Sequence, residues 1–151
     1  MRKMFGFFVS LLLLFFVLAC KKNSTTEQPV PTPDTTVPAI SLVDPVAGKN
    51  YILGAALHLQ MDLSDNVELK SYKITITKSS KGLQTSDWAY DVTTTIPSGK
   101  KTLSVNNSDI TVPLTVTGNQ TTTGNYDLTV TCYDTSSNQT AVTLTISLSK
   151  S

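Results

Sequence analysis

Apolar and polar residues alternate along most of the chain after residue 37. Alternation with period two is typical of strands that bury one face, and no window after residue 37 has the spacing of a helix. Weaker patterns predict further strands at residues 38–43, ended by Asp44-Pro45, and at residues 88–92, where Trp88, Tyr90 and Val92 share a face. Two short strands are expected on either side of Asn106-Asn107. The clearest inward-facing runs are Leu57, Leu59, Met61 and Leu63; Tyr72, Ile74 and Ile76; Tyr126, Leu128, Val130 and Cys132; and Val142, Leu144, Ile146 and Leu148.

These segments predict an all-β fold of seven to eight short antiparallel strands within residues 37–151. A β-sandwich is the expected architecture, and a closed barrel is the alternative. Cys132 shares the inward face with Leu128 and Val130, so it is expected to be a buried core thiol. His58 alternates with Leu57 and Leu59 and is expected at the surface.

The first nineteen residues have the features of a secretory signal. Arg2 and Lys3 precede an uncharged, mostly apolar run at residues 4–19, which is shorter than the roughly 20 residues that span a bilayer. Val17-Leu18-Ala19-Cys20 resembles the bacterial lipobox. This resemblance implies removal of the signal peptide at residues 1–19 and lipidation of Cys20 with palmitate-like chains. An ordinary signal peptide that happens to end near a Cys is the alternative.

Lipidation at Cys20 would make membrane lipid a partner, because two or three acyl chains hold a protein stably where one does not. The lipobox then predicts a cell-envelope location, in the outer membrane on its periplasmic or surface face. Residues 20–36 are rich in Pro, Ser and Thr, which predicts a flexible linker. The domain is expected at residues 37–151.

Charge and composition argue against several functions. Lys and Arg number 12 against 11 Asp and Glu, a net charge of +1, so no basic surface for nucleic acid is expected. One His and two Cys argue against a protein-only zinc site or a Ser-His-Asp triad. No carboxylate pair or phosphate loop stands out either, and the protein is therefore not expected to be an enzyme.

Three stretches resemble known families. Gly124-Asn125-Tyr126-Asp127-Leu128 resembles the penultimate strand of immunoglobulin-like (bacterial Ig and fibronectin-type) domains, whose Tyr forms a tyrosine corner with the backbone. The lead-in Asp34-Thr35-Thr36-Val37-Pro38 and the stretch at residues 64–74 resemble a Bacteroidota lipoprotein family, the domain of unknown function 4625. The resemblance implies an Ig-like β-sandwich behind a lipid anchor, and this family has no settled activity.

In an Ig-like sandwich the N-terminal lead-in, the loop between the second and third strands and the last hairpin meet at one pole. Oxygen ligands of Asp, Asn and Glu suit Ca²⁺, so a weak calcium site that stiffens the linker junction is one hypothesis. The alternative is that Asp and Asn simply form turns. The residues concerned are Asp34, Asp65, Asn66, Glu68, Asp134 and Asn138.

Trp88 and Tyr90 are the one close pair of large aromatic residues with same-face spacing. If they face inward they belong to the core, and if they face outward they provide a surface that stacks on sugar rings. Both interpretations are open from the sequence.

The function expected from these features is a non-catalytic, membrane-anchored lipoprotein with an Ig-like binding module, accessory to an outer-membrane transporter or adhesin. Its partner would be an envelope protein or a glycan. A structural spacer and a surface glycan-binding module are the alternatives. Binding is expected at the loops away from the anchor, residues 44–54, 78–87 and 116–124.

Overall fold

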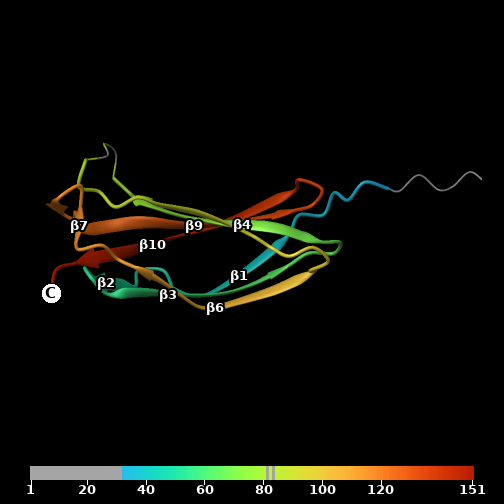
Figure 1. Cartoon of the computed structure of the whole chain (residues 1–151), viewed down its shortest axis with the longest axis horizontal. Coiled ribbons are helices and arrows are strands. Elements are labelled where there is room, and N and C mark those ends of the chain that lie inside the picture. The colour runs from blue at the N-terminus through green and yellow to red at the C-terminus, as the bar shows by residue number, and fades with distance from the viewer. Residues whose placement is uncertain (1–31, 81, 83) are drawn as a thin grey trace, which may run out of the picture. The chain divides into compact units, whose positions relative to one another are not determined.

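Two β-sheets pack face to face in the computed structural model, which describes residues 32–80, 82 and 84–151 (Figure 1). The smaller sheet has the order β1 (Ala39–Asp44), β3 (Ala56–Ser64), β6 (Thr102–Thr111). The larger sheet has the order β2 (Asn50–Ile52), β10 (Gln139–Ser149), β9 (Gly124–Asp134), β4 (Leu69–Lys78), β5 (Tyr90–Thr95). A small hairpin, β7 (Thr115–Val116) and β8 (Asn119–Gln120), lies apart from both. The predicted β-sandwich is confirmed, and the closed barrel is not formed.

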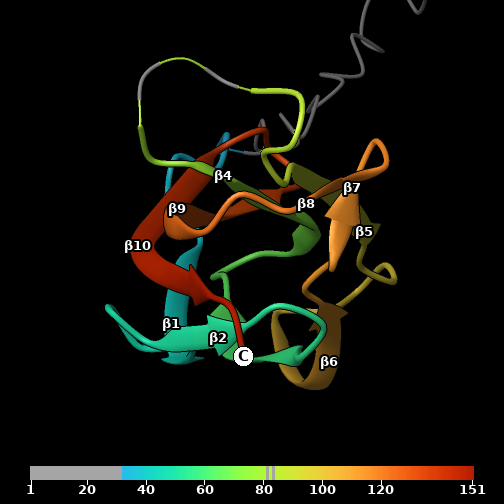
Figure 2. The same cartoon turned by 90° about the vertical axis from the view of Figure 1, so that its left-hand side faces the viewer.

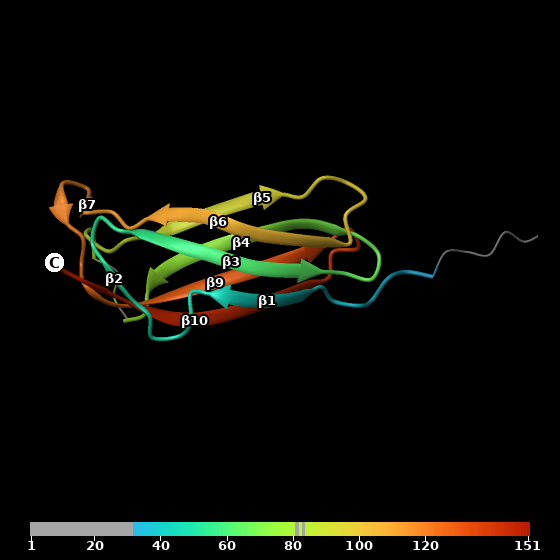
Figure 3. The same cartoon turned by 90° about the horizontal axis from the view of Figure 1, so that it is seen from below.

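The strand pairing is that of an Ig-like domain. The chain crosses between the sheets on both sides of β2, between β3 and β4, between β5 and β6, and between β6 and β9, while β9 and β10 form the long hairpin of the larger sheet. Short β2 runs parallel to β10, and all other pairs are antiparallel. Figure 3 shows the smaller sheet lying over β10, β9 and β4.

The core fills the space between the sheets and follows the predicted alternation. Every second residue of β3, β4 and β9 is buried, because the opposite sheet covers that face of each strand. Ile146 and Leu148 of β10 are also buried, whereas Val142 and Leu144 are partly covered. The fully buried large side chains include Leu57, Leu59, Met61, Leu63, Ile76, Tyr126, Leu128, Val130 and Ile146.

Tyr126 forms the predicted tyrosine corner. Its ring is fully buried at the start of β9, and its hydroxyl donates to the carbonyl oxygen of Thr122 at 2.7 Å. The same hydroxyl accepts the backbone N–H of Trp88 at 3.3 Å. The corner therefore joins the chain before β9 to the chain before β5.

The prediction of two short strands around Asn106-Asn107 is wrong, because β6 is one continuous strand. Its pairing with β3 shifts between Leu59, opposite Ser108, and Met61, opposite Val105. Two residues of β6 thus face one residue of β3, which is a β-bulge. The bulge lets Val105 and Ile110, which have opposite parity, both point into the core.

Other differences lie in short or peripheral elements. The sequence missed β2, β7 and β8, because strands of two or three residues carry too little alternation to recognise. Trp88 precedes β5 rather than belonging to it, and Val92 is 39% exposed although the pattern placed it inside. β5 is the edge of a five-stranded sheet opposed by three strands, so its side chains have less cover.

The compact unit runs over Pro33–Ser151 and so begins before residue 37, where the sequence pattern placed the start of the domain. Asp34 accounts for the difference, because its carboxylate accepts the N–H of Thr36 at 3.0 Å and the Asn66 amide at 3.0 Å. The predicted signal peptide, Cys20 and most of the predicted linker lie outside the described residues. Within the described ranges, no helix is both long and apolar enough to cross a membrane.

Candidate functional site

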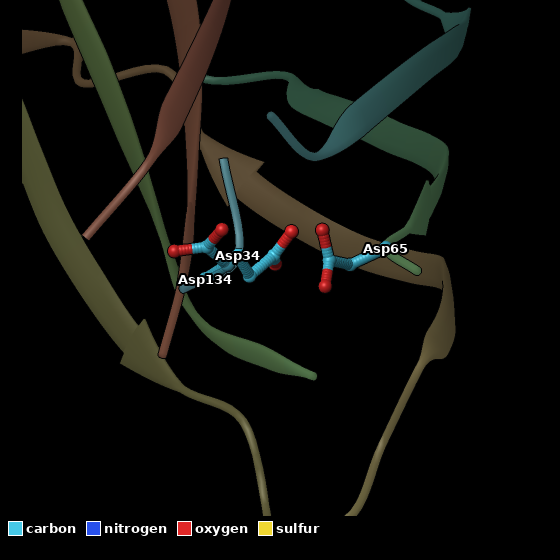
Figure 4. A group of neighbouring side chains, drawn as sticks. All are labelled: Asp34, Asp65 and Asp134. Carbon is cyan, nitrogen blue, oxygen red and sulfur yellow. The ribbon is translucent and has the colours of Figure 1, made fainter. Parts of the chain in front are cut away.

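The predicted acidic pole is present at the end of the sandwich where the N-terminal lead-in (residues 32–38) arrives. We call this the acidic end; it also contains the β3–β4 loop and the β9–β10 hairpin (Figure 1). Asp34 comes from the lead-in, Asp65 from the β3–β4 loop, and Asp134 from the last residue of β9. One carboxylate oxygen of each lies within 4.8 Å of the others, and Figure 4 shows the three side chains next to one another.

Each carboxylate is positioned by hydrogen bonds within its own loop. Asp65 Oδ2 accepts the N–H groups of Val67 and Glu68, both at 2.8 Å, which fixes the turn into β4. Asp134 is fully buried and accepts the backbone N–H and side-chain amide of Asn138, both at 2.7 Å. The turn chemistry that was the alternative to a metal site is therefore present as well.

Two oxygens of the group lack a hydrogen-bond donor within the part of the chain that the structure describes. These are Asp34 Oδ2 and Asp65 Oδ1, both of which are inaccessible to solvent. A buried carboxylate oxygen without a donor is costly, and two of them beside a third carboxylate add mutual repulsion. Turn formation explains the other oxygens of Asp34 and Asp65 but leaves these two unexplained.

The remaining residues of the predicted set divide into two groups. Asn66 and Asn138 lie at the cluster but act as donors, since the Asn138 amide also reaches the backbone oxygens of Asp34 at 3.1 Å and Thr36 at 3.3 Å. Glu68 is turned elsewhere: its carboxylate accepts Gly99 N–H at 2.6 Å and the Ser98 hydroxyl at 2.9 Å. Glu68 is thus not a ligand at this position, because those two donors hold it against the loop before β6.

The donors around Asp34 favour its charged form. The Asn66 amide, followed by the Thr36 N–H, lowers the pKa of the Asp34 carboxyl below its ordinary value. The Gly99 N–H and the Ser98 hydroxyl likewise lower the pKa of Glu68. The Asp34 carboxylate is therefore anionic at neutral pH, the state in which a carboxylate oxygen could coordinate Ca²⁺.

The opposite end of the sandwich gathers the loops that the sequence placed away from the anchor. We call it the far end, and Figure 2 views it directly, with β2 beside the C-terminus and β7 and β8 further up. The Thr117 hydroxyl donates to the Thr85 carbonyl at 2.8 Å, and Thr122 N–H donates to the Ser86 carbonyl at 3.0 Å. These bonds hold the segment before β9 against the segment before β5.

Exposed apolar side chains lie at this far end. Leu114 is 61% exposed and Ile52 is 45% exposed. Leu114 packs over Gly54, since a Cβ added at Gly54 would lie 3.1 Å from a Leu114 methyl carbon. Ile52 begins the turn that contains Gly54, in which Ala55 N–H donates to the Ile52 carbonyl at 3.0 Å.

Trp88, proposed from the sequence as a stacking residue, belongs to the core. It is 6% exposed, and its ring centroid lies 6.2 Å from those of Tyr90 and Tyr126. The backbone N–H of Trp88 donates to the Tyr126 hydroxyl of the tyrosine corner. Because the ring is buried beside Tyr126, it has no face left for a ligand. Tyr90 is only half-buried but packs edge-on against Trp88.

Cys132 and His58 lie where the sequence pattern placed them. Cys132 is a free, fully buried thiol, and burial raises its pKa to about 11, so the thiolate that nucleophilic chemistry requires is absent at neutral pH. His58 is on the outward face of β3, where Nδ1 lies 3.0 Å from an Asp109 carboxylate oxygen.

The two-sheet topology, the parallel β2–β10 pair and the tyrosine corner define this protein as an Ig-like β-sandwich domain with an acidic cluster at its N-terminal end. The family model described as "Domain of unknown function (DUF4625)" matches residues 18–149, and the chain belongs to that family. No curated protein matches the chain.

Proposed function

We propose that this protein is a non-catalytic lipoprotein of the cell envelope, which is attached to the outer membrane through Cys20 and presents an Ig-like domain that binds an envelope protein. The lipobox-like Val17-Leu18-Ala19-Cys20 supports the attachment. The resemblance of this chain to Bacteroidota lipoproteins supports the location in the outer membrane. An accessory role beside a transporter or adhesin fits a domain that carries loops rather than a catalytic grouping.

The observation that carries the binding role is the apolar surface at the far end. Single exposed apolar residues are ordinary on proteins, but Leu114 lies directly on the turn that Ile52 begins. A contiguous apolar patch of a few hundred Å² often marks an interaction site, and we propose that these two side chains belong to one. A pure spacer gains nothing from such a surface, and it would add a risk of aggregation.

The attachment is tested by metabolic labelling with a palmitate analogue. The wild-type protein should carry the label, and Cys20→Ser should not, because no acyl chain can then be added to residue 20. Label on Cys20→Ser, or an unlabelled wild type, would contradict the lipid anchor.

The partner is tested by affinity purification of the full-length, C-terminally tagged protein from native membranes dissolved in mild detergent. A stoichiometric membrane or surface protein in the eluate is the expected result. A clean eluate would contradict the protein-binding role and favour the spacer or the glycan-binding alternative.

The acidic end supports a second role, the binding of one Ca²⁺ ion that stiffens the junction between linker and domain. The specific support is the pair of unpartnered buried oxygens, Asp34 Oδ2 and Asp65 Oδ1. A cation there would neutralise the repulsion among the three carboxylates. It would also join the lead-in to both sheets, because Asp65 follows a strand of the smaller sheet and Asp134 ends a strand of the larger.

Calcium binding is tested by thermal unfolding of the full-length protein in EDTA and in 5 mM CaCl₂ (a concentration about 5–50 times the dissociation constant of a weak extracellular site). Saturation of that order adds about 1–2 kcal/mol, which raises the melting temperature by about 3–10 °C. Asp65→Asn keeps an oxygen for the turn N–H groups but should abolish the shift. Asp62→Asn is the matched control, because it removes a carboxylate from the outer face of β3, outside the cluster. No shift in the wild type would contradict calcium binding.

A further inference from the structure

A second candidate binding surface lies on the outer face of the larger sheet, near the acidic end and far from the hairpin β7–β8. Its outward positions are mainly threonines, including Thr75, Thr93, Thr129, Thr131, Thr143 and Thr145. Tyr133 is the aromatic residue among the outward positions of β9. Its ring is half-buried and faces the same side as its threonine neighbours.

A β-bulge places a lysine beside this tyrosine. In the β4–β9 pair, Leu69 lies opposite Asp134 and Ser71 lies opposite Tyr133, so Lys70 is the extra residue. Leu69 is buried, whereas Lys70 is exposed and Ser71 partly exposed. The bulge therefore turns two consecutive side chains, Lys70 and Ser71, toward the outer face, and bulges commonly re-aim side chains at functional sites.

The result is a shallow cavity of about 360 Å³ on the sheet face, near the lower limit of small-molecule sites, roughly 300–1,000 Å³. The residues that line it are Lys70, Ser71, Lys73, Thr93, Tyr133, Asp134 and Ser137. Lys73 pairs with Asp91 at 2.9 Å. Among the described residues, Lys70 has no carboxylate within ion-pair distance. Both oxygens of the buried Asp134 accept hydrogen bonds from Asn138.

We propose that this cavity binds an acidic sugar of a polysaccharide. A tyrosine ring offers an apolar face to a pyranose ring and a hydroxyl at its edge, Lys70 supplies a positive charge for a carboxylate or sulfate, and Ser71 and Thr93 supply hydroxyls. The cavity is shallow and offers both apolar and polar surface, which a charged sugar that stacks on a ring can use. The inference goes beyond the proposed function, because the proposed protein partner would bind elsewhere, at Leu114 and Ile52 of the far end.

The test is a calorimetric titration of the full-length protein, in detergent micelles, with trigalacturonate and with neutral maltotriose. Saturable binding of trigalacturonate and markedly weaker binding of maltotriose are expected. Tyr133→Thr, which keeps a good strand former, should raise the dissociation constant about tenfold. Lys70→Gln should raise it by about tenfold as well.

Two matched variants separate recognition from folding. Tyr133→Phe keeps the ring but not the hydroxyl and should lose less affinity than Tyr133→Thr. Lys150→Gln removes a lysine outside the cavity and should change nothing. Absence of trigalacturonate binding, equal binding of maltotriose, or unchanged binding in a folded Tyr133→Thr variant would each overturn the inference. None of these results affects the proposed protein partner, which the eluate of the affinity purification decides separately.

Discussion

At the scale of single residues, the hydroxyl of Tyr126 joins two stretches of chain that are separated in sequence by β5, β6, β7 and β8. It donates to the Thr122 carbonyl at 2.7 Å and accepts the Trp88 N–H at 3.3 Å. Trp88 directly follows the loop at residues 78–87, and Thr122 belongs to the loop at residues 116–124. The tyrosine corner is therefore a support for those loops as well as a part of the core.

Removal of this hydroxyl should destabilise the domain. Tyr126→Phe leaves the Thr122 carbonyl and the Trp88 N–H without their partner, which costs about 1–3 kcal/mol. Urea unfolding measures the difference, with Tyr90→Phe as the control because it removes the same atom from a half-buried ring. Equal stability of Tyr126→Phe and the wild type would show that the corner contributes nothing.

The thiol of Cys132 predicts how stability changes at high pH. Burial raises its pKa from 9.0 to about 11, so the thiol ionises first in the unfolded chain. The contribution of the protonated thiol to the free energy of unfolding is thus complete below about pH 9. It is lost as the pH rises toward 11, which lowers that free energy by on the order of 2 kcal/mol. Tyr51 and Tyr126, whose pKa values burial also raises, add to the same fall.

Comparison with Cys132→Val isolates the thiol. The free energy of unfolding of this variant should fall less steeply between pH 9 and pH 11 than that of the wild type. In the wild type, the native thiol should also resist a disulfide reagent until the protein is unfolded. Rapid labelling of the native protein would contradict a buried, protonated thiol.

At the scale of elements, the start of β9 depends on a glycine. Gly124 has a φ of +107°, and a Cβ there would lie 2.9 Å from Lys78 Nζ. Lys78 reaches over this position to the Thr123 carbonyl and lies 4.6 Å from the centre of the Tyr126 ring. A side chain at residue 124 would displace that ammonium group.

Gly124→Ala should therefore lower the free energy of unfolding more than a substitution that causes backbone strain alone. Gly118→Ala is the matched control, because Gly118 has a φ of +81° with no atom within 4 Å of an added Cβ. The control should lose about 1–2 kcal/mol from strain, and Gly124→Ala about 1 kcal/mol more from the lost lysine contacts. Chemical denaturation compares them, and equal losses would contradict a role for Lys78.

The long strands could be predicted from sequence because their alternation extends over several residues on one buried face. Leu57 to Leu63 and Tyr126 to Cys132 are examples. The bulge in β6 could not be predicted, since Val105 and Ile110 have opposite parity and only the pairing with β3 shows that both point inward. Trp88 was ambiguous for a related reason: the hydrogen bond that draws it inward comes from Tyr126, distant in sequence.

At the scale of the whole molecule, the two ends of the sandwich differ in chemistry. The acidic end brings Asp34, Asp65 and Asp134 together, as the Ig-like resemblance predicted from residues far apart in sequence. The far end carries Leu114 and Ile52 on loops joined by hydrogen bonds. Their juxtaposition could not be predicted, because neither belongs to an alternating strand of useful length. Nor could the position of Tyr133 beside Lys70, which depends on a bulge.

Glu68, which the sequence placed among the possible calcium ligands, points away from the acidic cluster. Glu68 is three residues from Asp65 and lies in the same loop. Loop membership places its backbone at the acidic end, but Gly99 N–H and the Ser98 hydroxyl fix the direction of its side chain. Sequence position therefore identified the pole, whereas the contacts decided which residues can serve there.

The central claim is that the far end of the domain binds an envelope protein while the N-terminal end provides attachment. The most direct measurement is quantitative recovery of the partner in affinity purifications with the wild type, an Ile52→Ser/Leu114→Ser double variant and Val67→Ser. Val67 is 45% exposed in the β3–β4 loop of the acidic end, so it is the matched control. We predict that the double variant loses the partner about tenfold or more while Val67→Ser retains it. Equal recovery with all three proteins, or loss with Val67→Ser alone, would contradict the claim.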